Sequence, residues 1–210
     1  MFMKKLSVLF MVILASLVVK AQEDPKFGIK AGLNVSNLDF SNDASTDWRA
    51  GFHAGGLAHI HITPSFSLQP EVYYSSQGAK IPNTSGGDKV NLNLSYINVP
   101  VLLQYNFRNG FRLQGGPQVG FLVGVSDKVN DVELNRYSTD DFKTVDVSLP
   151  LGLSYLAYSG LGVDVRYNLG LTNINKDTPP TAQNRDLQIG AFYLFDHRHK
   201  VESIKKGRRR

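Results

Sequence analysis

The stretch Leu161-Gly-Val-Asp-Val-Arg-Tyr-Asn-Leu-Gly170 places apolar and polar residues in strict alternation. Its odd-numbered positions are all Leu, Val or Tyr, and its even-numbered positions are Gly, Asp, Arg and Asn. Because successive side chains of a β-strand point to opposite faces, this pattern predicts a strand with one apolar and one polar face. Two opposite charges, Asp164 and Arg166, share the polar face.

The same period of two recurs along the chain. Each run has about nine to twelve residues, which is the length that a tilted membrane-spanning strand requires. The eight runs are 27–36, 52–62, 66–75, 96–107, 111–123, 145–155, 161–169 and 186–195. The sequence therefore predicts an all-β fold with eight strands.

The apolar faces of these runs carry no charged residue. A water-soluble sandwich or barrel would place Lys and Glu on its exterior, whereas an exterior of Val, Leu, Ile and aromatic residues suits contact with lipid. The polar faces then fill the interior. The charged residues that we single out on them are Lys30, Glu71, Arg112, Asp146, Asp164 and Arg166. This distribution predicts a transmembrane β-barrel with a polar lumen.

Short and long connections alternate without exception. The short ones are tight turns at 63–65, 108–110 and 159–160, and they contain the Pro, Asn and Gly residues that such turns need. The long ones cover 36–51, 78–93, 125–144 and 173–185. An even number of strands joined in this way predicts an antiparallel up-and-down meander. Since a strand edge cannot stay unpaired in lipid, the first and last strands should pair and close the barrel. Short turns and both termini should face the periplasm.

Four prolines interrupt the alternating runs, at Pro70, Pro100, Pro117 and Pro150. Each removes a hydrogen bond of the strand ladder, and a closed barrel has no edge at which this loss is harmless. We therefore expect local irregularities at these positions.

The two ends of the chain differ from its body. Residues 1–21 combine a short basic start with an apolar stretch and a small residue at Ala21, which predicts a cleaved signal peptide. The barrel domain should cover 22–195, and 196–210 should be a basic, disordered tail with seven Lys or Arg and two acidic residues. The 13 basic and 16 acidic residues of 22–195 leave a net charge of −3, so nucleic-acid binding is not expected. The chain has no Cys, which excludes disulfides and thiolate chemistry.

Several blocks resemble the PorT-like outer-membrane β-barrel family, a group of small barrels within the wider porin family. They are Gly28-Ile-Lys-Ala-Gly-Leu-Asn34, Gln69-Pro-Glu-Val-Tyr-Tyr74 with Gln77-Gly-Ala-Lys80, Tyr96-Ile-Asn-Val-Pro-Val-Leu-Leu-Gln-Tyr105, Gly116-Pro-Gln-Val-Gly120 and Arg166-Tyr-Asn-Leu-Gly-Leu171. The resemblance implies an eight-stranded outer-membrane barrel of a Gram-negative envelope. It implies little about activity, although the founding member is associated with a secretion system.

The lumen charges are the main candidate site. Glu71, Asp146 and Asp164 are matched in number by Lys30, Arg112 and Arg166, which predicts a structural ionic network that fills a narrow interior. Counting back from the turn at 159–160 puts Asp164 opposite Tyr155. The counting also leads us to expect that Arg166 reaches Glu71 or Asp146 across the lumen rather than a neighbour along its own strand.

Histidines offer two alternatives to a purely structural interior. His59 and His61 share the lumen face with His53, and Glu71 is a conceivable third ligand for a metal ion. We expect lumen histidines without a metal, and neither a cofactor nor catalytic residues. A Ser/His/acid hydrolase would need its groups together on an exposed face, and no His lies on the apolar face of any run.

Three classes of function remain open. The first is a non-enzymatic surface protein that acts as a scaffold, binds through its external loops, or supports the envelope or secretion. The second is a small pore, which a side-chain-filled lumen disfavours. The third is a membrane-embedded hydrolase. We favour the first, with the outer-membrane lipid bilayer, the barrel-assembly machinery and an extracellular or envelope protein as expected partners.

Overall fold

The computed structural model describes residues 24–42, 46–82, 87–130, 132–176 and 180–195. The expected signal peptide (1–21) and the expected tail (196–210) lie outside the described residues. The strands are β1 (Lys26–Phe40), β2 (Arg49–His61), β3 (Phe66–Ile81), β4 (Val90–Asn106), β5 (Phe111–Gly115), β6 (Gln118–Val129), β7 (Val132–Glu133), β8 (Val145–Leu156), β9 (Leu161–Gly170) and β10 (Ala182–Leu194). A 3-10 turn, η1 (Thr139–Asp141), lies between β7 and β8. The described residues include no helix long and apolar enough to cross a membrane.

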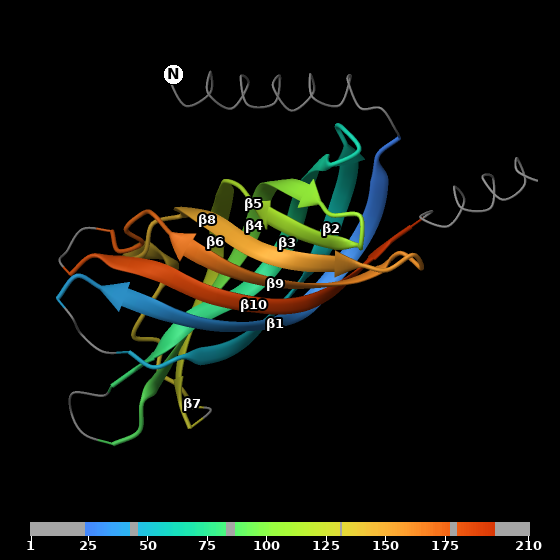
Figure 1. Ribbon diagram of the computed structural model, residues 1–210. Coiled ribbons are helices and arrows are strands. Elements are labelled where there is room, and N and C mark those ends of the chain that lie inside the picture. The colour runs from blue at the N-terminus through green and yellow to red at the C-terminus, as the bar shows by residue number, and fades with distance from the viewer. Residues whose placement is uncertain (1–23, 43–45, 83–86, 131, 177–179, 196–210) are drawn as a thin grey trace, which may run out of the picture.

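The strands form one antiparallel sheet that closes on itself (Figure 1). β1 pairs with β10 from Gly28 opposite Leu194 to Phe40 opposite Ala182, so the first and last strands close the ring. β5 and β6 both lie between β4 and β8 and form one wall, and β7 is a short hairpin arm on β6. The barrel therefore has eight strand positions around its ring, which we call walls, and β5 and β6 together occupy one of them. The expected eight-stranded up-and-down barrel is confirmed.

The break between β5 and β6 falls at Pro117, one of the four prolines expected to disturb the ladder. Leu103 of β4 pairs with Gly115 of β5, and Pro100 of β4 pairs with Gln118 of β6. Both pairs have the register that one continuous strand would have. The amide of Gly116 donates to the carbonyl of Pro150 on β8. The missing N–H of Pro117 therefore interrupts the hydrogen bonds without shifting the register.

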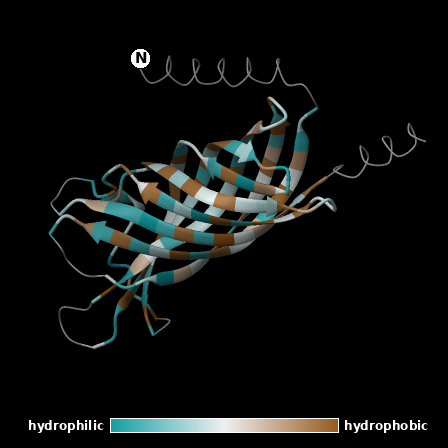
Figure 2. Cartoon of the chain, viewed as in Figure 1, coloured by the Kyte–Doolittle hydropathy of each residue, from teal (hydrophilic) through white to brown (hydrophobic). Residues whose placement is uncertain are grey.

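Side chains on the outer face belong to the apolar sets of the sequence. Phe27, Leu33, Leu153, Val163 and Ile189 are each more than half exposed, while the polar positions between them are buried. Figure 2 shows the resulting alternation of hydrophobic and hydrophilic residues along the strands. Burial of the polar face and exposure of the apolar face invert the usual arrangement of a soluble protein, as a lipid-embedded barrel requires.

The long connections are shorter than expected, because several strands continue beyond the apolar band. The barrel end with the long connections is called the external end, and the end with the short turns the periplasmic end, after the predicted orientation. The expected loop 78–93 is wrong in extent: β3 and β4 stay paired from Gly78 opposite Asn93 to Ile81 opposite Val90. β6 likewise runs to Val129. The outward residues of these extensions are polar, so the alternation that marks lipid contact ends while the backbone ladder continues.

The turn between β8 and β9 differs by one residue from the expected count. The structure pairs Asp164 with Ser154 and Arg166 with Gly152, so the expectation that Asp164 lies opposite Tyr155 was wrong. Ala157 accepts from the amide of Gly160, whose φ is +88°, and the turn holds three residues rather than two. This register keeps both charges on the same face as Ser154.

Candidate functional site

The centre of the lumen holds an ion pair that spans the barrel. Arg166 on β9 donates from Nη1 to Oε2 of Glu71 at 2.8 Å and from Nη2 to Oε1 at 2.9 Å. β9 and β3 are four positions apart in the ring of eight walls, so the two side chains come from opposite walls. Both side chains are buried, at 1% and 0% exposure. Parallel hydrogen bonds of this kind define the relative position of guanidinium and carboxylate closely.

Two further charges complete the cluster. Lys30 on β1, midway between the opposite walls, places Nζ 3.1 Å from Oε2 of Glu71 and 3.7 Å from Oδ2 of Asp164. Nη2 of Arg166 lies 2.9 Å from Oδ2 of Asp164. Arg166 therefore reaches Glu71 across the lumen, one of the two partners expected for it. It also contacts Asp164 on its own strand, and sequence counting did not anticipate that contact. The four side chains sum to no net charge, which suits their burial.

The other two charges on the sequence-derived list lie elsewhere. Asp146, near the external end, accepts from Thr172 Oγ1 at 2.6 Å and from Asn184 Nδ2 at 2.7 Å. Arg112 lies beside the periplasmic turn, where it is 5% exposed and forms no ion pair with another described residue. The six charges therefore do not form one network, because Asp146 and Arg112 lie near opposite ends of the barrel.

Further polar side chains, among them the carboxylate of Asp186, extend the central layer, and sequence reasoning did not single them out. The Tyr73 hydroxyl donates to Oε1 of Gln118 at 2.8 Å, and Gln118 Nε2 donates to Ser148 Oγ at 2.9 Å. Asp186 accepts from Gln188 Nε2 at 2.9 Å and from Asn168 Nδ2 at 3.1 Å. All of these residues lie on the polar faces of their runs, which was the available signal.

Apolar clusters lie above and below this polar layer. At the periplasmic end the cluster consists of Leu57, Leu156, Phe192 and Leu194. At the external end it consists of Leu38, Ala79, Leu92, Leu94, Tyr96, Leu122, Phe142, Ile174 and Ala182. The inward residues of a single strand, β10, pass through all three layers, from Leu194 through Gln188 to Ala182. Side chains thus occupy the lumen at both ends as well as at its centre.

The lumen histidines are dispersed between two levels. His53 Nδ1 lies 2.6 Å from Oδ1 of Asn34. The rings of His59 and His61 stack edge to face near the periplasmic end, with centroids 4.6 Å apart. Within the described part of the chain, no group of three or more His, Cys, Asp or Glu side chains is arranged to hold a metal ion.

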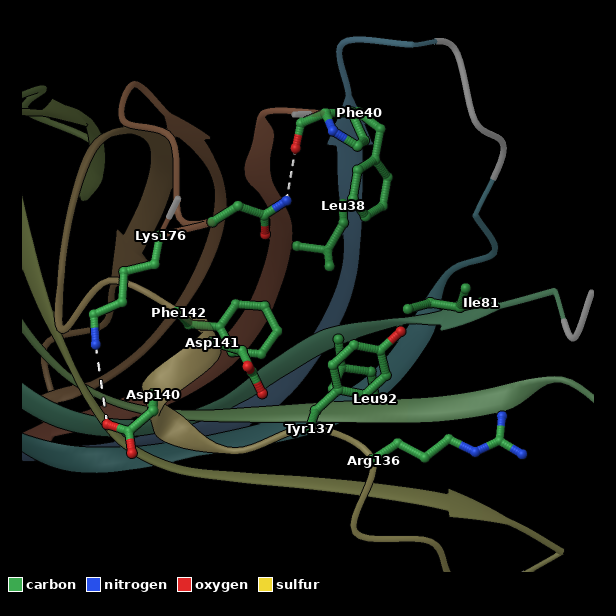
Figure 3. A pocket seen from close by; sticks show the side chains of 12 residues that line it. Leu38, Phe40, Ile81, Leu92, Arg136, Tyr137, Asp140, Asp141, Phe142 and Lys176 are labelled. Carbon is green, nitrogen blue, oxygen red and sulfur yellow. Dashed lines mark hydrogen bonds and ion pairs between the residues drawn. The ribbon is translucent and has the colours of Figure 1, made fainter. Parts of the chain in front are cut away.

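A pocket of about 410 Å³ opens at the external mouth, above the apolar cluster (Figure 3). Its apolar lining comes from three parts of the chain. β1 supplies Leu38 and Phe40, β3 and β4 supply Ile81 and Leu92, and the segment after β7 supplies Tyr137 and Phe142. Sequence reasoning marked 125–144 and 173–185 as external connections but did not place them around a shared cavity.

Charged side chains surround the pocket edge. Lys176 Nζ lies 3.9 Å from Oδ1 of Asp140, as Figure 3 shows. Asp141 accepts from the amide of Ser138 at 2.7 Å, which caps the turn η1. Arg136 lies next along the same segment. The mouth therefore combines an apolar floor with a charged rim.

Comparison with known proteins identifies the family. Residues 20–176 match the model of the outer membrane protein beta-barrel domain. This chain belongs to that family. It is an integral protein of the outer membrane, embedded in the lipid bilayer through the outward apolar faces of its strands. The expected localisation is confirmed.

Solved structures agree with this assignment at the level of the fold. The crystal structure of Neisserial surface protein A (NspA) has 14% identity and a TM-score of 0.56, over 82% of this chain and 100% of that chain. The attachment invasion locus protein Ail of Yersinia pestis, in complex with the heparin analogue sucrose octasulfate, has 12% identity and a TM-score of 0.51, with the same coverage. A search of curated proteins found no match.

Proposed function

We propose that this protein is a non-enzymatic surface barrel that binds at its external mouth and keeps its lumen closed. The observation that carries this proposal is the Arg166–Glu71 pair, which joins opposite walls at the centre of the lumen. Apolar clusters fill the lumen on both sides of it. Eight strands enclose an interior that side chains can fill. We therefore expect no continuous path of water through these layers.

The roles of the remaining segments follow from the same proposal. Residues 1–21 direct export and are removed, and the barrel-assembly machinery inserts the mature chain. The blocks around 28–34, 69–80 and 96–105 support a PorT-like subgroup, with an accessory role in the envelope or in secretion. The external protein or small molecule that such a role needs would meet the loops around the outer mouth.

Conductance of the purified protein in planar bilayers tests the closed lumen. We expect no stable open steps at moderate voltage, and a trimeric porin added to the same bilayer serves as the positive control. Stable, reproducible open steps would overturn the proposal in favour of a small pore.

The absence of catalysis has its own test. We expect neither lipase nor protease activity from protein folded in vesicles. An activity that disappears when His53, His59 and His61 are replaced by Ala would contradict a non-enzymatic role.

A further inference from the structure

The pocket at the external mouth is built from segments far apart in the sequence. β1, β3, β4, the segment 136–142 and the residues Asn175, Lys176 and Pro180 all contribute to its walls. Its volume of about 410 Å³ falls within the usual range of small-molecule sites, roughly 300–1,000 Å³. Such sites combine apolar and aromatic side chains with a smaller number of placed polar groups. Here seven of the twelve lining residues are apolar or aromatic, and Figure 3 shows Phe40, Tyr137 and Phe142 among them.

The floor of this pocket is the top of the external apolar cluster. Leu38, Leu92 and Phe142 belong both to the pocket lining and to the cluster, and each is at most 5% exposed. The polar layer of the lumen lies beneath that cluster. A ligand entering from outside would therefore meet an apolar surface with no route onward, which suits binding rather than passage.

The position of the pocket wall is held by a buried carboxylate. Asp127 on β6 is 1% exposed and accepts from the amide of Arg136 at 3.1 Å and from the amide of Tyr137 at 3.4 Å. These bonds tie the segment that carries Arg136 and Tyr137 to the barrel wall. The pocket is thus formed before any ligand arrives.

The charges at the rim differ in their partners. Asp140 is paired with Lys176, and Asp141 is bound by the Ser138 amide. Arg136 is exposed, and its guanidinium has no hydrogen bond or ion pair with any residue in the described part of the chain. Among the rim residues that the structure describes, Arg136 is thus the cation without a protein partner, and it lies beside an apolar floor.

We propose that this outer-mouth pocket binds a small amphipathic anion. An aromatic or short aliphatic body packs on the partly exposed side chains of Phe40, Ile81 and Tyr137, and one carboxylate, sulfate or phosphate group accepts hydrogen bonds from Arg136. This inference rests on the proposed function, because it names the ligand class of the same external mouth.

Methyl NMR of the protein in phosphatidylcholine nanodiscs tests the inference, with 3-phenylpropionate as the probe. Ile81 lines the pocket, and Ile189 lies on the lipid face, where it reports any partition of the probe into the bilayer. We expect saturable shifts at Ile81 and little change at Ile189. The cation 3-phenylpropylammonium should bind about tenfold more weakly, since it lacks the charge-assisted hydrogen bond.

Two matched variants separate the charge from general effects. Arg136→Gln should weaken 3-phenylpropionate binding about tenfold, whereas Lys128→Gln should leave it unchanged. Lys128 is an exposed base on β6 that does not line the pocket. An unaltered Ile189 signal in each variant shows that the barrel is folded.

The following outcomes would overturn the inference: no saturable shift at Ile81, equal binding of both probes, or binding insensitive to Arg136→Gln. Conductance measured on the same preparation separates this failure from that of the proposed function. A barrel that does not conduct and does not bind the probe would contradict the ligand inference alone. A barrel that conducts would contradict the proposed function.

Discussion

Arg166 and Glu71 face each other from opposite walls of the barrel and share two hydrogen bonds, at 2.8 and 2.9 Å. The residues are 95 positions apart in the chain. Their contact forms only when β9 and β3 have taken their places in the same closed ring. The pair therefore couples the two halves of the barrel at the level of the central polar layer.

Replacing one member of this pair should destabilise the barrel clearly. Arg166→Met leaves Glu71 with the cation Lys30 and the neutral donor Gln69, and removal of one partner of a buried pair typically costs about 3–5 kcal/mol. Adding Glu71→Gln should recover part of that loss, because the stranded charge is then gone. Urea unfolding in detergent micelles measures the double-mutant cycle. Strictly additive effects would refute the coupling.

Arg112→Met is the matched control for this cycle. Arg112 is buried to a similar degree but forms no ion pair with another described residue. Its replacement should cost much less than that of Arg166, since no carboxylate is left without its partner. A loss as large as that of Arg166→Met would show that burial, rather than pairing, sets the cost.

A charge on the lipid face should be poorly tolerated. Val101 lies within the outward apolar set of β4, so Val101→Arg should cost about 2–4 kcal/mol if the site is near the midplane. Ala50→Arg, outward and exposed at the external end of β2, should cost about 0–1 kcal/mol. Folding yield into lipid vesicles compares the two variants, and equal yields would contradict the assigned lipid face.

Gly162 should resist enlargement because Phe192 occupies the space beside it. A Cβ at position 162 would lie 2.2 Å from the Phe192 ring, far inside contact distance. Gly162→Ala should therefore destabilise by about 1–3 kcal/mol, and Phe192→Ala in the same chain should relieve the clash. Thermal or urea unfolding of the single and double variants measures the cost of Gly162→Ala with and without the Phe192 ring. An equal cost in both backgrounds would contradict the predicted clash.

Asp127 should hold the external segment in place without contributing much to the barrel itself. Asp127→Ala removes the acceptor for the amides of Arg136 and Tyr137, so their hydrogen exchange should accelerate about tenfold. Glu133→Ala, an exposed acid nearby, is the control and should have no such effect. Unchanged exchange at both amides in Asp127→Ala would rule out this anchoring role.

The fold itself was largely accessible from sequence, because alternation with a period of two is a local property. The run from Leu161 to Gly170 shows its apolar and polar faces without reference to any other strand. Charged residues occur only on the polar faces of the runs, and the uncharged apolar faces indicated contact with lipid. Closure of the ring then followed from the cost of an unpaired edge in a membrane.

Tertiary structure alone decided which lumen residues meet. Asp146 and Arg112 satisfy the same pattern as Glu71 and Arg166, yet they lie at different heights because strand tilt and register set the level of each residue. The three layers of the lumen and the pocket at its mouth are likewise products of register. Alternation defines the face on which a side chain lies, whereas its neighbours across the barrel depend on how the walls are staggered when the ring closes.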